Sequence, residues 1–178
     1  MELIGTATVG SGGQTSIAFT AIPQTYTDLY VVYSTRTSTS SWDPSAFYFN
    51  TDTGGNYEML MLYADANGVG SATNASYLSQ YNNWAIFWMQ PSVFTANTFG
   101  STSVYIPNYA LTAQYKSVST DNVTENNSAT AARQIGAGLW RSNSAINAIT
   151  LAPYGGTFVE HSTASLYGIA SGSDGTTT

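Results

Sequence analysis

Residues 22–36 read IPQTYTDLYVVYSTR, and their centre is an unbroken run of large β-favouring residues, Leu29 to Tyr33. Pro23 and a short polar turn precede the run, and Ser34 ends it. Five consecutive aromatic or aliphatic residues predict a strand that is buried on both of its faces. We therefore expect this strand at the centre of a β-sheet, with the remaining strands arranged around it.

The composition is typical of a folded domain made of strands. Of the 178 residues, 43% are hydrophobic and 13% aromatic, whereas 8% are charged, against about 25% in average domains. The sequence has no cysteine, which excludes a disulfide framework and cysteine-based zinc sites. We predict a single domain over residues 1–170 and a flexible tail over residues 171–178.

The charge distribution argues against several classes of partner. The formal net charge is −6, and the four cationic residues are scattered along the chain, so no basic cluster indicates nucleic-acid binding. No apolar run approaches the length of about 20 residues that spans a membrane. Glu2 stands where a signal peptide carries positive charge, so we expect that the protein is made without a secretion signal.

Alternating and continuous apolar patterns predict about ten strands, spaced as in an antiparallel β-sandwich. Residues 2–9 and 15–22 are expected to form one hairpin, and residues 46–50 and 56–63 another, across the turn TDTGG. Residues 64–76 read as a loop because they are rich in Gly, Asn and Ser. The other predicted strands are 84–89, 101–106, 113–119, 130–140, 145–151 and 164–170.

Two predicted strands, NYEMLMLY (56–63) and WAIFWM (84–89), are apolar on both faces. One face could fill the core while the other meets a neighbouring subunit, or long loops could cover both. The candidate subunit-interface residues are Tyr57, Met59, Met61, Trp84, Phe87, Trp88 and Met89. A third possibility is that exposed tryptophans and tyrosines form a platform for stacking sugars, although most strand aromatics pack in cores.

No pattern in the sequence indicates catalysis or a cofactor. The single histidine, His161, follows Glu160, and neighbours on a strand point to opposite faces, so the two form no local dyad. There is no GxSxG motif, and the acidic residues are scattered. We therefore predict no enzyme, with no catalytic, cofactor-binding or metal residues.

Two loops place oxygen-bearing side chains at alternate positions, as calcium loops do. They begin at Asp52 (DTGGN) and at Asp65 (DANG), but neither has the full ligand pattern or its bidentate glutamate. Both also match ordinary turns, in which Gly and Asn accept a positive φ. We favour the turns, and calcium binding is the alternative.

The order of several short motifs resembles a group of tailed-phage virion proteins, cyanophage proteins included. The motifs are IPQTYTDLYVVYSTR, YFNTDTGGNY, VYIPNYA, AITLAP and STASLYGI, and the likeness covers residues 15–170. Such proteins are head decoration or cement proteins, or terminal domains of fibres. The resemblance implies a jelly-roll or related β-sandwich, often trimeric. This chain starts directly in its first strand, without a fibre's attachment segment and shaft, which favours the decoration protein.

Three functional classes follow. The first is a capsid decoration or cement protein on the outer surface of the virion, bound to the major capsid protein and to itself as a trimer. Its acidic balance suits a surface that faces away from packaged DNA. The second is a tail-fibre or receptor-binding domain that recognises host cell-surface glycan. The third is an enzyme such as a polysaccharide depolymerase, for which the sequence offers the least support.

Overall fold

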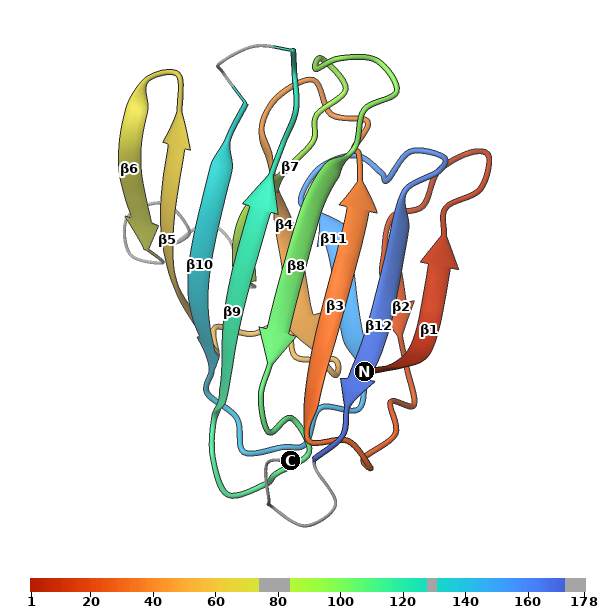
Figure 1. The fold of residues 1–178 in the computed structure, drawn as a ribbon, viewed down its shortest axis with the longest axis vertical. Helices are drawn as coiled ribbons and strands as arrows, with labels where there is room; N and C mark the ends of the chain where they lie inside the picture. Colours follow the sequence, from red (N-terminus) through yellow and green to blue (C-terminus); the bar gives the residue numbers. More distant parts are fainter. Residues whose placement is uncertain (74–83, 128–130, 172–178) are drawn as a thin grey trace, which may run out of the picture.

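The computed structural model describes residues 1–73, 84–127 and 131–171, and these ranges form twelve strands in two antiparallel sheets (Figure 1). The all-β sandwich predicted from the sequence is confirmed. The larger sheet has the order β1 (Glu2–Thr8), β12 (Thr163–Ile169), β3 (Asp28–Thr35), β8 (Gly100–Ile106), β9 (Lys116–Val123), β10 (Arg133–Trp140), β5 (Tyr57–Asp65) and β6 (Gly68–Thr73). The smaller sheet has the order β2 (Ile17–Phe19), β11 (Ile149–Pro153), β4 (Asp43–Phe49) and β7 (Trp84–Met89).

Eight of the strands form a jelly roll. β1 pairs with β12, β2 with β11, β3 with β8, and β4 with β7, so the pairing is nested from the two ends of the chain inward. Along the chain these eight strands alternate between the two sheets except at β4 and β7, which pair within the smaller sheet, and this gives the half-sheets β1-β12-β3-β8 and β2-β11-β4-β7. This wrapping is the double-sheet arrangement of jelly rolls, and it confirms the jelly-roll-like architecture.

The other four strands enlarge one sheet only. The pairs β5–β6 and β9–β10 are inserted between β4 and β7 and between β8 and β11, and they add four strands beside β8. The inner face of this extension is partly covered by β7, which lies against β5, β9 and β10. Its outer face has no second layer in the described chain, as Figure 1 shows. None of the described residues forms a helix long and apolar enough to cross a membrane.

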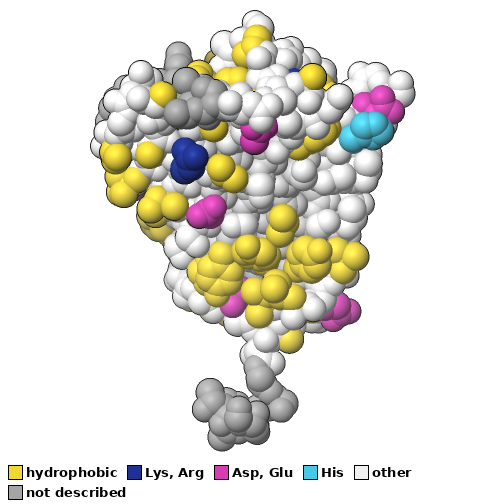
Figure 2. Space-filling view, turned by 45° about the horizontal axis from the view of Figure 1, so that its top comes forward, with side chains coloured by type: hydrophobic (Ala, Val, Ile, Leu, Met, Phe, Trp, Pro, Cys, Tyr) yellow, Lys and Arg dark blue, Asp and Glu magenta, His cyan; other side chains and the backbone are white. Residues whose placement is uncertain are grey.

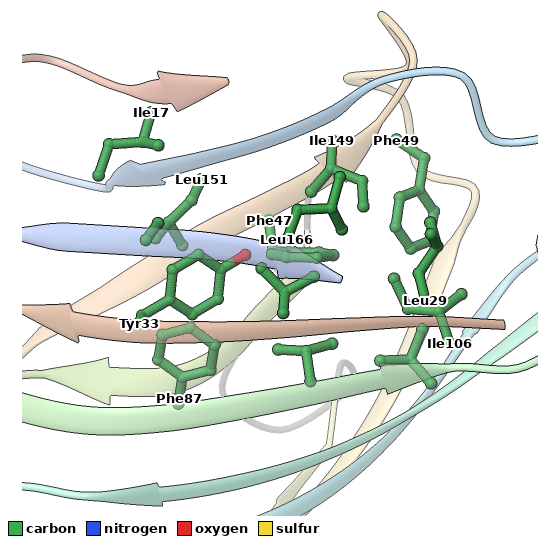
Figure 3. Close-up of a cluster of buried hydrophobic side chains, with 14 of the residues drawn as sticks. Ile17, Leu29, Tyr33, Phe47, Phe49, Phe87, Ile106, Ile149, Leu151 and Leu166 are labelled. Carbon is green, nitrogen blue, oxygen red and sulfur yellow. The ribbon is translucent and has the colours of Figure 1, made fainter. Parts of the chain in front are cut away.

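The core lies between the two sheets, and β3 contributes to it from one face only (Figure 3). Leu29, Val31 and Tyr33 are almost completely buried, and the Tyr33 ring packs against Phe47 from the other sheet. Burying each such side chain contributes about 2 kcal/mol. Val32, on the opposite face, is 37% exposed. The prediction that this strand is buried on both faces was therefore wrong, because only one side of the larger sheet is covered.

Three local predictions are corrected by the strand pairing. Residues 15–22 do not form a hairpin with residues 2–9, since β2 pairs with β11 and β1 with β12. The strands on either side of TDTGG belong to different sheets, so that turn carries the chain across the sandwich. Residues 68–73, predicted as loop, form β6. Of the predicted tail at 171–178, only residue 171 belongs to the described residues, and the rest of that prediction lies outside them.

A buried arginine holds the loop that follows β7. Arg36 is 7% exposed, and its guanidinium Nη1 donates hydrogen bonds to the carbonyl oxygens of Thr95 (2.8 Å) and Thr98 (2.9 Å). Its Nη2 donates to those of Ser92 (2.8 Å) and Phe94 (3.0 Å). Desolvation lowers the pKa of Arg36, but guanidinium remains charged in proteins. The cation is thus a partner of four loop carbonyls, of which that of Thr95 also accepts hydrogen bonds from the amide and hydroxyl of Thr98.

Candidate binding face

The outer face of the larger sheet carries a row of three tyrosines and one leucine that crosses four adjacent strands. Tyr30 on β3 lies opposite Tyr167 on β12 and opposite Tyr105 on β8, and Tyr167 lies opposite Leu3 on β1. We call these four residues the tyrosine row. Leu3 is 55% and Tyr105 36% exposed, and the two other tyrosines are half-buried. Figure 2 shows hydrophobic side chains gathered on the lower part of this face.

One end of the tyrosine row is fixed by a carboxylate. The Tyr105 hydroxyl donates a hydrogen bond to Asp28 Oδ2 (2.8 Å), and the backbone N–H of Asn108 donates to Asp28 Oδ1 (2.9 Å). The bond to the Asp28 carboxylate raises the pKa of Tyr105, with a further contribution from desolvation. The tyrosine is therefore a neutral hydrogen-bond donor at physiological pH, and its ring is held in one position.

A second apolar area covers the outer face of β5 and β10. Leu62 lies opposite Ile135, and Leu60 lies opposite Ala137. We call these four residues the leucine patch. Leu60, Leu62 and Ile135 are each about half exposed, and they line a shallow hollow over the two strands. Large aliphatic side chains on a solvent-facing sheet are the usual sign of an interaction surface.

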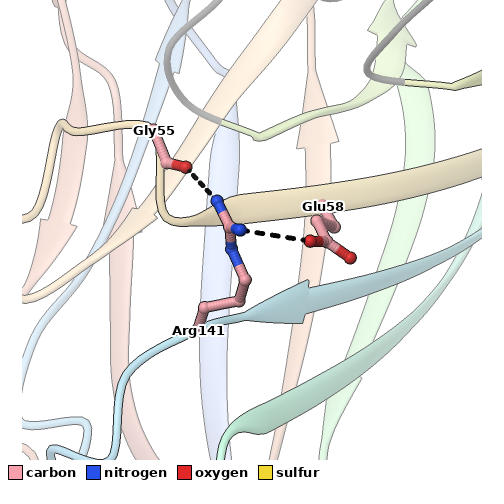
Figure 4. Close-up of polar contacts among 3 residues, drawn as sticks. All are labelled: Gly55, Glu58 and Arg141. Atoms are coloured by element: carbon pink, nitrogen blue, oxygen red, sulfur yellow. Dashed lines mark hydrogen bonds and ion pairs between the residues drawn. The ribbon is translucent and has the colours of Figure 1, made fainter.

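Charged residues border the leucine patch at both ends. At one end Arg141 forms an ion pair with Glu58 (3.4 Å) and donates a hydrogen bond to the Gly55 carbonyl oxygen (2.6 Å), as Figure 4 shows. At the other end, Arg133 and Asp121 stand on β10 and β9. The ion pair is exposed, so it adds little to stability. Its position instead gives the patch a polar rim, as protein interfaces have.

Most of the predicted interface residues lie in the core instead. Tyr57, Met59 and Met61 occupy the inner face of β5, and Phe87 and Met89 the inner face of β7, all at most 5% exposed. The side chains that β5 does expose are the alternate ones, Leu60 and Leu62. The prediction that these β5 side chains meet a neighbouring subunit was therefore wrong, because β7 covers the face on which they lie. Both faces of β5 are apolar, and the sequence does not show which one β7 covers.

The two tryptophans among the predicted interface residues, Trp84 and Trp88, are not part of this buried set. Trp88 is half-buried, and its ring packs against Trp42 (5.3 Å between ring centroids) and Tyr63 (4.9 Å). Trp42 also contacts Phe94 edge-on (4.9 Å), so these rings cluster among themselves rather than forming a flat platform. The side chain of Trp84 lies outside the described part of the structure. The tyrosine row, by contrast, aligns aromatic side chains across neighbouring strands, and the sequence did not single it out.

The Asp52 loop is a turn anchored by an indole. The Asp52 carboxylate accepts hydrogen bonds from Trp140 Nε1 (2.7 Å), the Gly54 amide (2.9 Å) and Asn56 Nδ2 (2.9 Å). The Asp52 carbonyl oxygen also accepts from the Tyr57 hydroxyl (2.8 Å). Desolvation raises the pKa of Asp52, but the three hydrogen bonds outweigh it and the pKa is lowered. This geometry favours the turn over the calcium loop, since N–H donors occupy both carboxylate oxygens.

Asp52→Ala is expected to lower the free energy of unfolding by about 2 kcal/mol, because the buried Trp140 indole loses its acceptor. A lowered pKa in the folded state means that this contribution exists above the ordinary pKa of 3.8 and fades as pH falls through the lowered value. Denaturant unfolding at neutral and acidic pH measures both effects. Asp65→Ala removes the carboxylate of a turn that contains no indole, so it should lower the free energy of unfolding by less than about 1 kcal/mol. An equal cost for the two variants would contradict this role for Asp52.

Two other residues weighed in the sequence analysis, Asp65 and His161, lie at turns. Asp65 accepts a hydrogen bond from the Asn67 amide (2.7 Å) in an exposed turn. His161 is exposed in the turn before β12, with a φ of 72°, and its amide donates to the Val9 carbonyl oxygen (2.9 Å). Within the described ranges, no three histidine, aspartate or glutamate side chains are grouped as metal ligands.

Comparison of the chain with models of protein families, with curated proteins and with solved structures found no match in any of the three. The class of the protein therefore follows from its own architecture. It is an all-β protein with a jelly-roll β-sandwich, in which one sheet is doubled in width and exposes apolar side chains on its outer face.

Proposed function

We propose that this protein is a non-enzymatic structural protein of a virion, a decoration or cement protein that binds and stabilises the assembled capsid. The observation that carries the proposal is the leucine patch, in which Leu60, Leu62 and Ile135 stay about half exposed on a sheet without a second layer. The jelly roll supports it, because this fold is common in viral capsid proteins. The motif resemblance to tailed-phage virion proteins points the same way.

The partner surface is the major capsid protein, and copies of this chain associate around it as a trimer. The leucine patch supplies the apolar contact, and Glu58, Arg141 and Arg133 at its rim supply orientation. An interface of this kind needs about 800 Å² from each partner, so it extends beyond the patch onto neighbouring parts of β6 and β9.

The distribution of charge supports a position on the outer surface of the virion. Of the four cationic residues, Arg36 and Lys116 are buried, which leaves only Arg133 and Arg141 to face solvent. The outside of the molecule is therefore more strongly acidic than the composition alone indicates. Such a surface is repelled by packaged DNA and by anionic membranes, so neither is a partner in this proposal.

Stabilisation of the capsid follows from mass action. A protein that binds the assembled shell but not the free capsid subunits favours the shell by its binding free energy. We expect particles that lack this protein to release their DNA at a temperature several degrees lower than complete particles. A fluorescent dye that reports DNA release during heating makes the measurement. Adding back the purified protein should restore the higher temperature, whereas equal release temperatures throughout would rule out a cement function.

A further inference from the structure

We propose that the tyrosine row is a binding site for a neutral polysaccharide, whose chain lies across β12, β3 and β8 with its sugar rings stacked on tyrosine rings. This site is separate from the leucine patch. One strand, β9, lies between them, and Ser119 stands between Tyr105 and Ala137. The outer positions of β9 are polar at Ser117, Ser119 and Asp121 and apolar at Val123. The inference does not rest on the capsid role, since it concerns different residues and a different ligand.

The geometry of the tyrosine row matches an extended ligand. Neighbouring strands lie about 4.8 Å apart, so the four side chains form a strip on the order of 15 Å long at right angles to the strands. Each tyrosine ring offers an apolar surface for the C–H face of a sugar ring and a hydroxyl at its tip. Because Asp28 holds the Tyr105 ring, little entropy of this side chain is lost on binding.

The chemistry around the tyrosine row indicates a neutral, hydroxyl-rich ligand. The adjacent row on the same face carries Ser165, Val32 and Ser103, which lie opposite one another on β12, β3 and β8. Serine hydroxyls donate and accept hydrogen bonds, as sugar hydroxyls do. Asp28 is hydrogen-bonded to Tyr105 in the row, and a carboxylate disfavours an anionic ligand.

The exposed area of the tyrosine row favours a glycan over a second copy of this chain. A tyrosine side chain has on the order of 200 Å² of surface, so the 36% exposure of Tyr105 leaves on the order of 70 Å². The half-buried Tyr30 and Tyr167 expose less, so the whole strip offers a few hundred Å² at most. By itself the strip is smaller than the area of about 800 Å² that each partner of a stable protein interface buries, whereas it is large enough for a short run of sugar rings.

The test is affinity electrophoresis of the native protein through gels that contain a neutral β-glucan, a mannan or a galactan, with chondroitin sulfate as the acidic comparison. Each gel is run with wild type, Tyr30→Thr, Tyr167→Thr and their double variant. Threonine removes the ring but keeps a residue that strands favour. The control is Tyr154→Thr, which removes an exposed tyrosine in the turn after β11. Circular dichroism melting verifies that each variant is folded.

We expect at least one neutral polysaccharide to retard the wild type and Tyr154→Thr equally. Each row substitution should weaken that interaction about tenfold, and the double variant should migrate as in an empty gel. Tyr105→Phe should bind within about threefold of wild type, because it keeps the stacking ring. Absence of retardation by all three neutral polysaccharides, retardation by chondroitin sulfate alone, or equal retardation of the double variant would overturn the proposal.

Discussion

Arg36→Met is expected to lower the free energy of unfolding by about 4 kcal/mol, and the melting temperature by about 10 °C. The substitution keeps the aliphatic volume but removes every donor from a side chain that is 7% exposed. Four carbonyl oxygens, from Ser92, Phe94, Thr95 and Thr98, then lose their shared partner. Hydrogen bonds to a charged group are the strong kind, and breaking one side of a buried set leaves the other unsatisfied.

Two further variants make this prediction specific to the guanidinium. Arg36→Lys should recover only part of the loss, because an ammonium group cannot direct two nitrogens at separate pairs of carbonyls. Arg133→Met, at an exposed arginine on β10, should change stability by less than about 0.5 kcal/mol. Thermal and denaturant unfolding give both numbers. If Arg36→Met and Arg133→Met melted at the same temperature, the loop would not depend on Arg36.

The second large effect is expected on binding rather than on stability. The double variant Leu62→Lys/Ile135→Glu should bind capsids more than about 100-fold more weakly than wild type, because two charges enter an apolar interface. The two residues lie directly opposite each other on β5 and β10, so the new charges form a cross-strand pair. The isolated fold should therefore melt within a few degrees of wild type. Cosedimentation with particles that lack the protein measures the affinity.

A matched control places the same charges elsewhere on the same sheet. Thr6 lies opposite Ser165 on the outer face, and the two hydroxyls share a hydrogen bond (3.0 Å). Thr6→Lys/Ser165→Glu should bind capsids as wild type does, because β1 and β12 lie at the far edge from the leucine patch. If both double variants bound equally well, the leucine patch would not be the contact surface.

Strand positions could be predicted from the sequence more fully than the faces of the strands. The run from Leu29 to Tyr33 is continuous in apolar character, yet its residues alternate between the core and solvent. β5 is equally ambiguous: the prediction placed Met61 at an interface, but Met61 lies in the core and its neighbour Leu62 is exposed. Which face is covered depends on a strand from another part of the chain, and no local pattern carries that information.

Long-range pairing explains the other differences between prediction and structure. The turn after Phe49 resembles a hairpin in sequence, but β4 pairs with β11 and β7, which lie far along the chain. Tyr30, Tyr105 and Tyr167 each stand at an outward position of their strands. Their alignment into one row needs the strand order, which only the nested pairing provides. The sequence does not indicate that Arg36 is buried, because the residues around it are polar.

A reconstruction of the native particle by electron cryomicroscopy tests the central claim most directly, since it locates the protein and shows which face it turns to its partner. We predict density for this β-sandwich over the outer surface of the head, with the outer face of β5 and β10 against the major capsid protein. Density confined to the tail tip, or on the head with Leu62 and Ile135 facing solvent, would contradict the capsid-binding role of this face.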